Sequence, residues 1–135
     1  MIYLLDTNAC IRLLNRSSPA LIQRFRDTPP SRVRLCAVVK AELLYGARKS
    51  HKAAANLQKL KRFFAPIKSL PFDDACAEQA GQIRAELESH GTPLGPMDLL
   101  IAATAVQFGA TLVTHNTNEF SRVAGLSLED WETEL

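Results

Sequence analysis

The chain has 135 residues, of which 47% are hydrophobic, a length that fits one domain with a sizeable core. No apolar run reaches the roughly 18 residues of a membrane-spanning helix, and the first residues lack the basic segment and cleavage site of a signal peptide. We therefore expect a single cytoplasmic domain over residues 1–135, with no membrane segment. Cys10, Cys36 and Cys76 match no zinc or redox spacing, which favours three small hydrophobic residues in the core.

The net charge of +2 conceals a strong asymmetry along the chain. Residues 1–68 contain 14 of the 16 lysines and arginines and three acidic residues, whereas residues 69–135 contain two arginines and 11 acidic residues. The first half therefore carries +11 and the second half −9. Such a division predicts one face that attracts a polyanion. The alternative is that the basic side chains lie on ordinary solvated helix faces.

Short apolar runs alternate with segments of helical periodicity along the whole chain. Strands are predicted at residues 2–5, 33–37, 67–70 and 111–114, with a last short strand around Leu126. Helices are predicted from residue 9, from Pro19, at 38–49 and 51–64, from Asp73 and from Pro96 to Gly109. This alternation predicts an α/β fold in which helices cover both faces of a short, mostly parallel sheet, a three-layer α/β/α sandwich.

Asp6 follows the first predicted strand directly and precedes a helix. In open parallel sheets, ligands bind beyond the carboxyl ends of the strands, which makes Asp6 a candidate site residue. The alternative is that Asp6 only caps the helix, a task that Thr7 or Asn8 could also perform.

Two further carboxylates occupy comparable places. Glu42 lies in the helix after the second strand, among apolar neighbours, and an exposed position is the usual alternative for a glutamate. Asp98 falls in the first turn of an almost wholly apolar helix, where it could simply complement the helix dipole. In a parallel sheet, these acids and the polar turn after the fourth strand meet at one edge. Carboxylate oxygens there suit Mg²⁺ or Mn²⁺.

Four segments together resemble the PIN-domain nucleases. They are Leu5-Asp6-Thr7-Asn8, Ala41-Glu42-Leu43-Leu44-Tyr45-Gly46, Asp98 with Leu100-Ile101-Ala102, and Thr114-His115-Asn116 with Glu119-Phe120. The length of the chain and the segment from Gly81 to Pro96 are similar to the VapC toxins of type II toxin–antitoxin pairs. The resemblance covers essentially the whole chain.

The resemblance implies a Mg²⁺- or Mn²⁺-dependent endoribonuclease that cuts structured RNA by metal-activated water. It implies that Asp6, Glu42 and Asp98 are metal ligands, with Asn116 and Glu119 completing the catalytic set. Many relatives have aspartate where Asn116 stands, and Glu119 could supply the charge that is missing there. Since hard ions prefer oxygen, we expect His115 to contact RNA or solvent instead.

The resemblance also implies the partners of the chain. They are a VapB-type antitoxin that keeps the enzyme inactive, RNA, with initiator tRNA favoured, and a second copy in a homodimer. Candidates for binding the phosphate backbone are the basic residues of the first half: Arg12, Arg16, Arg32, Arg34, Lys40, Arg48 and Lys49. An amphipathic antitoxin helix could lie between the helices at 38–49 and 51–64.

Two other classes of protein fit the fold. A phosphoacceptor signalling domain using Asp6 would need a lysine and an acidic cluster near a third strand, and neither is evident. A non-catalytic scaffold that binds RNA or a partner would not require Asp6, Glu42 and Asp98 together.

Overall fold

A five-stranded parallel sheet forms the centre of the computed structural model, which describes residues 1–133. The strands are β1 (Tyr3–Leu5), β2 (Val33–Cys36), β3 (Lys68–Leu70), β4 (Thr111–Val113) and β5 (Ser127–Glu129), in the order β3-β2-β1-β4-β5. Leu4 of β1 is in register with Arg34 of β2 and with Leu112 of β4. The predicted strands are confirmed, with the last one shifted slightly beyond Leu126.

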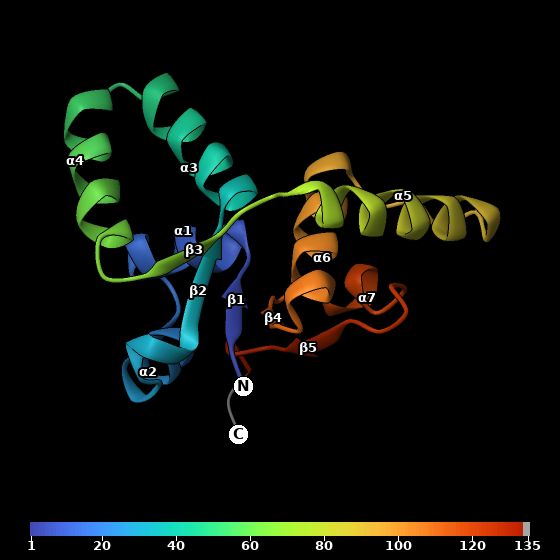
Figure 1. The fold of residues 1–135 in the computed structure, drawn as a ribbon. Helices are drawn as coiled ribbons and strands as arrows, with labels where there is room; N and C mark the ends of the chain where they lie inside the picture. The colour runs from blue at the N-terminus through green and yellow to red at the C-terminus, as the bar shows by residue number, and fades with distance from the viewer. Residues whose placement is uncertain (134–135) are drawn as a thin grey trace.

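Helices cover both faces of the sheet, with α1 to α4 on one side and α5 to α7 on the other (Figure 1). They are α1 (Thr7–Asn15), α2 (Pro19–Asp27), α3 (Ala37–Lys49), α4 (Ala53–Phe64), α5 (Asp74–Ser89), α6 (Pro96–Phe108) and α7 (Thr117–Phe120). A short 3-10 helix (Pro30–Arg32) precedes β2. The predicted three-layer α/β/α sandwich is confirmed. Within residues 1–133, no helix combines the length and apolarity required to cross a bilayer.

Helix α6 has the boundaries that its sequence predicts. Pro96 occupies the start of the helix, where its missing N–H group leaves no backbone bond unmade. Gly109 ends the helix with φ of 63°, in the left-handed region that glycine adopts readily. Between them, Ile101, Ala102 and Ala103 are fully buried. The helix thus presents Asp98, in its first turn, from a rigid element of the core.

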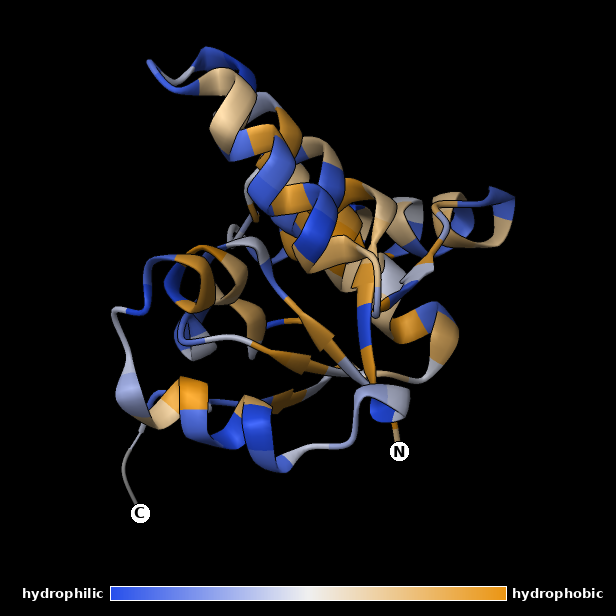
Figure 2. Ribbon diagram, turned by 90° about the vertical axis from the view of Figure 1, so that its left-hand side faces the viewer, coloured by the Kyte–Doolittle hydropathy of each residue, from blue (hydrophilic) through white to orange (hydrophobic). Residues whose placement is uncertain are grey.

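The core lies between the sheet and the two helical layers. The strand residues Leu4, Leu35 and Leu112 are fully buried, and the central strands are coloured as hydrophobic in Figure 2. The three cysteines are reduced and buried, as the sequence predicts, and burial raises the pKa of each thiol. They therefore serve as small core residues.

Trp131, which the sequence pattern did not single out, closes the core after β5. It is 1% exposed, packs edge-on against Tyr3 at a centroid distance of 5.1 Å and donates from its ring N–H to Glu129 at 2.9 Å. The residues that follow β5 are therefore anchored to the central strand of the sheet.

The strand order places a topological switch beside β1. The chain proceeds from β1 outward through β2 to β3, then returns to place β4 on the other side of β1. The crossovers diverge at this point, so the carboxyl ends of β1 and β4 border the crevice where such sheets bind ligands. The α3–α4 hairpin and α5 extend beyond this edge on its two sides (Figure 1).

Candidate active site

Asp6 stands at the carboxyl end of β1 and is buried, with 5% of its surface exposed. Its Oδ1 accepts a hydrogen bond of 2.8 Å from the backbone N–H of Ala9, so it is the N-cap of α1. The capping alternative is therefore correct as a description, but it does not account for the charges around this group. Burial raises the pKa of Asp6, and repulsion from Asp98 and Glu132 raises it further, against hydrogen bonds from Thr114 and Ala9 that lower it.

Glu42 reaches the same edge from α3. The hydroxyl of Thr7, the first residue of α1, donates to Glu42 Oε1. The carboxylate is thus neither fully buried nor free on the surface, because this bond fixes it to the residue that follows Asp6. Thr7 ties two acid-bearing helices together, and the sequence offered it only as an alternative cap.

Asp98 completes the set from the opposite layer of helices. Partial burial raises the pKa of Asp98, and the negative charges of Glu42 and Glu119 raise it further. Glu119 lies in the short helix α7, after β4. Repulsion thus links Asp6 to Asp98, and Asp98 to Glu42 and Glu119. The carboxylate at the end of β1 and those on α3, α6 and α7 therefore share one electrostatic environment. Mutual repulsion of this kind favours the binding of a cation.

The turn after β4 supplies the polar groups of the site. The backbone N–H of Asn116 donates to the hydroxyl of Thr114 at 3.0 Å, and the Thr114 side chain lowers the pKa of Asp6. Asn116 precedes α7 without capping it through its side chain, so its amide group is not used in that way. His115 points elsewhere: its Nδ1 is 2.9 Å from Asp130 Oδ2.

The structure divides the predicted phosphate-binding residues into groups. Arg32 lies in the 3-10 helix before β2, and the guanidinium of Arg34 hydrogen-bonds to the carbonyls of Ser31 and Val33. Arg32 therefore lies before β2 and the Arg34 guanidinium is held at the amino end of that strand, whereas the acids lie beyond the carboxyl ends of the strands. Arg12 forms an ion pair with Glu132 at 3.1 Å.

The remaining basic candidates are nearer to the helices that border the acids. Arg48 and Lys49 lie in the last turn of α3, the helix that carries Glu42. The Lys49 ammonium lies over the Tyr45 ring at 5.4 Å from its centroid, and Lys40 lies over Phe64 at 5.0 Å. Arg16 ends α1 in a left-handed conformation.

A model of the PIN domain matches residues 3–126 of the chain. The chain is 41% identical, over 129 residues, to the tRNA(fMet)-specific endonuclease VapC of Shigella flexneri, a match that covers 96% of this chain and 97% of the relative. It superposes with a TM-score of 0.91 and 38% identity on a chain of the DNA-bound VapBC structure from Salmonella typhimurium, covering 97% of this chain and 98% of the other. The values for VapBC2 of Rickettsia felis, bound to a promoter DNA fragment, are 0.90 and 37%, with coverage of 97% and 99%.

The chain has a short parallel sheet with carboxylates at its switch point, and the PIN-domain model matches almost the whole chain. The chain therefore belongs to the PIN-domain family. Within that family it groups with the VapC ribonucleases, the toxin components of VapBC toxin–antitoxin pairs.

Proposed function

We propose that the chain is a metal-dependent endoribonuclease in which Asp6, Glu42 and Asp98 hold a Mg²⁺ or Mn²⁺ ion. The observation that supports this most strongly is that Asp6, at the carboxyl end of β1, and three carboxylates on α3, α6 and α7 interact electrostatically beside the switch point of the sheet. An all-oxygen donor set suits these hard cations, and the mutual repulsion of Asp6 and Asp98 is the electrostatic condition that a cation relieves. A divalent ion held by these residues would acidify a bound water and neutralise negative charge at the scissile phosphate.

The protein's own groups orient this chemistry. The Ala9 N–H fixes Asp6 Oδ1 and so holds the carboxylate, which would act as a metal ligand, at the carboxyl end of β1. Thr7 holds one Glu42 oxygen by its hydroxyl, which restricts the carboxylate to the edge of the sheet. Asn116 and Glu119 then serve to position water and the RNA backbone, with Glu119 supplying the fourth negative charge. No side chain needs to form a covalent intermediate.

We propose structured RNA as the substrate, and initiator tRNA in particular, because the VapC of Shigella flexneri is a tRNA(fMet)-specific endonuclease. Basic residues at the end of α3, Arg48 and Lys49, would hold the phosphate backbone beside Glu42. We leave Arg32 and Arg34 out of the proposed surface, because Arg32 precedes β2 and Arg34 bonds to the Ser31 carbonyl at the amino end of that strand.

The proposed substrate is tested by comparing the cleavage of two tRNAs that differ little in size and charge. Purified protein with Mn²⁺ is expected to cut initiator tRNA at a defined position, while elongator methionine tRNA is cut at least tenfold more slowly. Sequencing the RNA ends gives the position. Equal cleavage of both would reject the initiator assignment alone, whereas no cleavage of any RNA, with metal bound, would favour a non-catalytic scaffold.

We further propose that a VapB-type antitoxin inhibits the enzyme from an apolar groove between α1, α3 and α4. The groove has a volume of about 290 Å³ and is lined by residues that include Leu14, Leu43, Leu60, Lys59 and Glu42. Since Glu42 belongs both to the groove and to the acid set, an amphipathic segment seated there lies next to the active site. An arginine of the antitoxin could then pair with the carboxylates.

Substitution of two lysines of α4 tests whether the antitoxin binds in this groove. Lys59 lines the groove, whereas Lys61 on the same helix does not, and both are exposed. Lys59→Glu is expected to weaken antitoxin binding at least tenfold, and Lys61→Glu to leave it unchanged. Equal effects would place the antitoxin elsewhere. Blockade of the active site additionally requires weaker Mn²⁺ binding in the complex.

We also propose a homodimer, which light scattering of the purified chain would test.

A further inference from the structure

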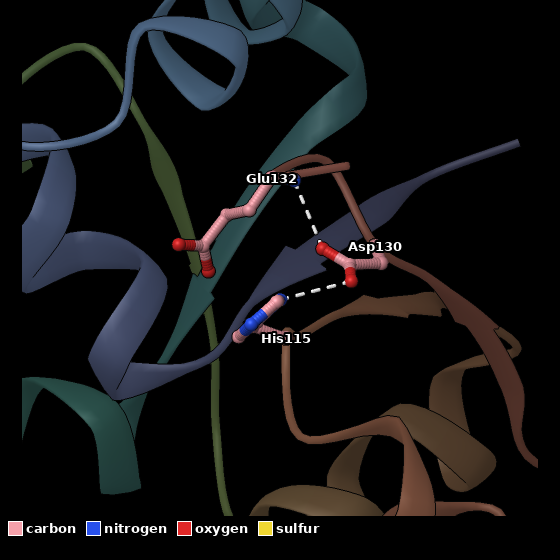
Figure 3. A group of neighbouring side chains, drawn as sticks. All are labelled: His115, Asp130 and Glu132. Carbon is pink, nitrogen blue, oxygen red and sulfur yellow. Dashed lines mark hydrogen bonds and ion pairs between the residues drawn. The ribbon is translucent and has the colours of Figure 1, made fainter. Parts of the chain in front are cut away.

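Beside the acid set, a second group of side chains has the composition of a metal site. His115, at the end of β4, lies next to Asp130 and Glu132, which follow β5 (Figure 3). Each residue offers one ligand atom, and these atoms all lie within 4.8 Å of one another. Within residues 1–133, this is the one group of three or more histidine, cysteine, aspartate or glutamate side chains that meets this distance.

The two acidic members are held in place by the core. Trp131, between them in sequence, is 1% exposed, so the backbone that presents both carboxylates is anchored against β1. The N–H of Glu132 donates to Asp130 Oδ1 at 2.9 Å, which leaves Oδ2 directed to His115 (Figure 3). A site whose ligands are already fixed loses little conformational entropy when an ion binds.

The donor set differs in kind from the proposed catalytic one. An imidazole nitrogen with two carboxylates favours ions of intermediate softness, such as Zn²⁺, over Mg²⁺. We propose that His115, Asp130 and Glu132 form a second metal site that binds Zn²⁺, with three protein ligands and an open position for water. This site would join the end of β4 to the segment after β5. It does not depend on the proposed nuclease activity.

Arg12 competes with a zinc ion for the Glu132 carboxylate. Its guanidinium forms a two-pronged contact with Glu132, with Nε 3.1 Å from Oε1 and Nη1 3.3 Å from Oε2. The metal-free protein thus neutralises Glu132 with Arg12 and pairs Asp130 with His115. A zinc ion that takes Glu132 as a ligand weakens its contact with Arg12, so removing the guanidinium should strengthen zinc binding. A cluster that exists only as an ion-pair network would not bind zinc in either form.

The test measures zinc binding in a protein whose catalytic acids are disabled by Asp6→Asn and Asp98→Asn. In this background we expect one Zn²⁺ per chain by calorimetry. His115→Asn should weaken that binding at least tenfold, as should Glu132→Gln, and circular dichroism would verify that both variants are folded. His51→Asn, which removes an exposed histidine elsewhere, serves as the matched control and should leave binding unchanged.

Arg12→Gln provides a result of opposite sign, an increase in zinc affinity of at least threefold. The proposal is overturned if the background protein binds no zinc saturably, if His115→Asn binds it as tightly as the background, or if His51→Asn weakens it equally. Failure of RNA cleavage in the wild type has no bearing on these outcomes, because none of them uses activity as its readout.

Discussion

Asp6 has two roles that a pair of substitutions separates. It caps α1 through the 2.8 Å bond to Ala9, and it contributes negative charge to the site. Asp6→Asn keeps an oxygen that can accept the capping bond, whereas Asp6→Ala removes it. Loss of such a cap costs about 1 kcal/mol, which for a domain of this size lowers Tm by about 4 °C. We therefore expect the alanine variant to be less stable than the asparagine variant by this amount, and both to be inactive.

The charge gives the asparagine variant a distinct dependence on pH. Because the folded protein raises the pKa of Asp6, ionisation of this group opposes folding as the pH rises above its ordinary value of 3.8. Without metal, Asp6→Asn should match the wild type at pH 3.5 and become more stable than the wild type as the pH rises above 3.8, and it should keep that advantage at pH 7. Urea unfolding in EDTA at these pH values measures the difference. A variant that is less stable than the wild type at pH 7, or that retains cleavage, would refute the assignment of Asp6 as a crowded metal ligand.

Other predictions follow from the same geometry. Asp98→Asn should abolish cleavage and leave the metal-free fold as stable as the wild type, as followed by circular dichroism; unfolding or full activity would contradict this. Reversing Arg48 and Lys49 to Glu should reduce the salt dependence of RNA affinity by about two phosphate contacts, while Arg32→Glu serves as a control that changes it little; equal effects would remove α3 from the RNA-binding surface. Mn²⁺ at 100 times its Kd should stabilise the wild type by about 2.7 kcal/mol in thermal unfolding, and stabilise Asp6→Asn much less; equal stabilisation would place the ion elsewhere.

Local patterns predicted the fold well because periodicity reports which faces are buried. The alternation of apolar runs with helical segments gave the sheet and its flanking helices, and Pro96 and Gly109 marked the ends of α6. The four-residue helix α7 was not predicted, since a single turn has no measurable periodicity.

The position of the acids was predictable to the edge of the sheet, but their contacts were not. Asp6 follows a strand in the sequence, which places it at the carboxyl end. The hydroxyl bond from Thr7 to Glu42 spans 35 residues, and the pairing of Arg12 with Glu132 spans 120. No local pattern encodes such distances, because tertiary packing alone brings these groups together.

The charge asymmetry of the sequence does not say which of the basic residues bind RNA. The excess of basic residues in the first half is real, but it does not say which side of the sheet they face. Arg32 and Arg34 lie near the amino end of β2, away from the acids, and Arg12 forms an ion pair with Glu132. Only the folded structure separates them from Arg48 and Lys49.

The role of the carboxylates at the switch point is tested most directly by the initial rate of initiator tRNA cleavage as a function of free Mn²⁺ concentration. The wild type should show no cleavage in EDTA and a rate that saturates with Mn²⁺. Asp98→Asn, folded and at the same concentration, should remain at least a hundredfold slower at every Mn²⁺ concentration. Cleavage by the wild type in EDTA, or a saturating rate for Asp98→Asn equal to that of the wild type, would contradict a metal-dependent nuclease centre built on these acids.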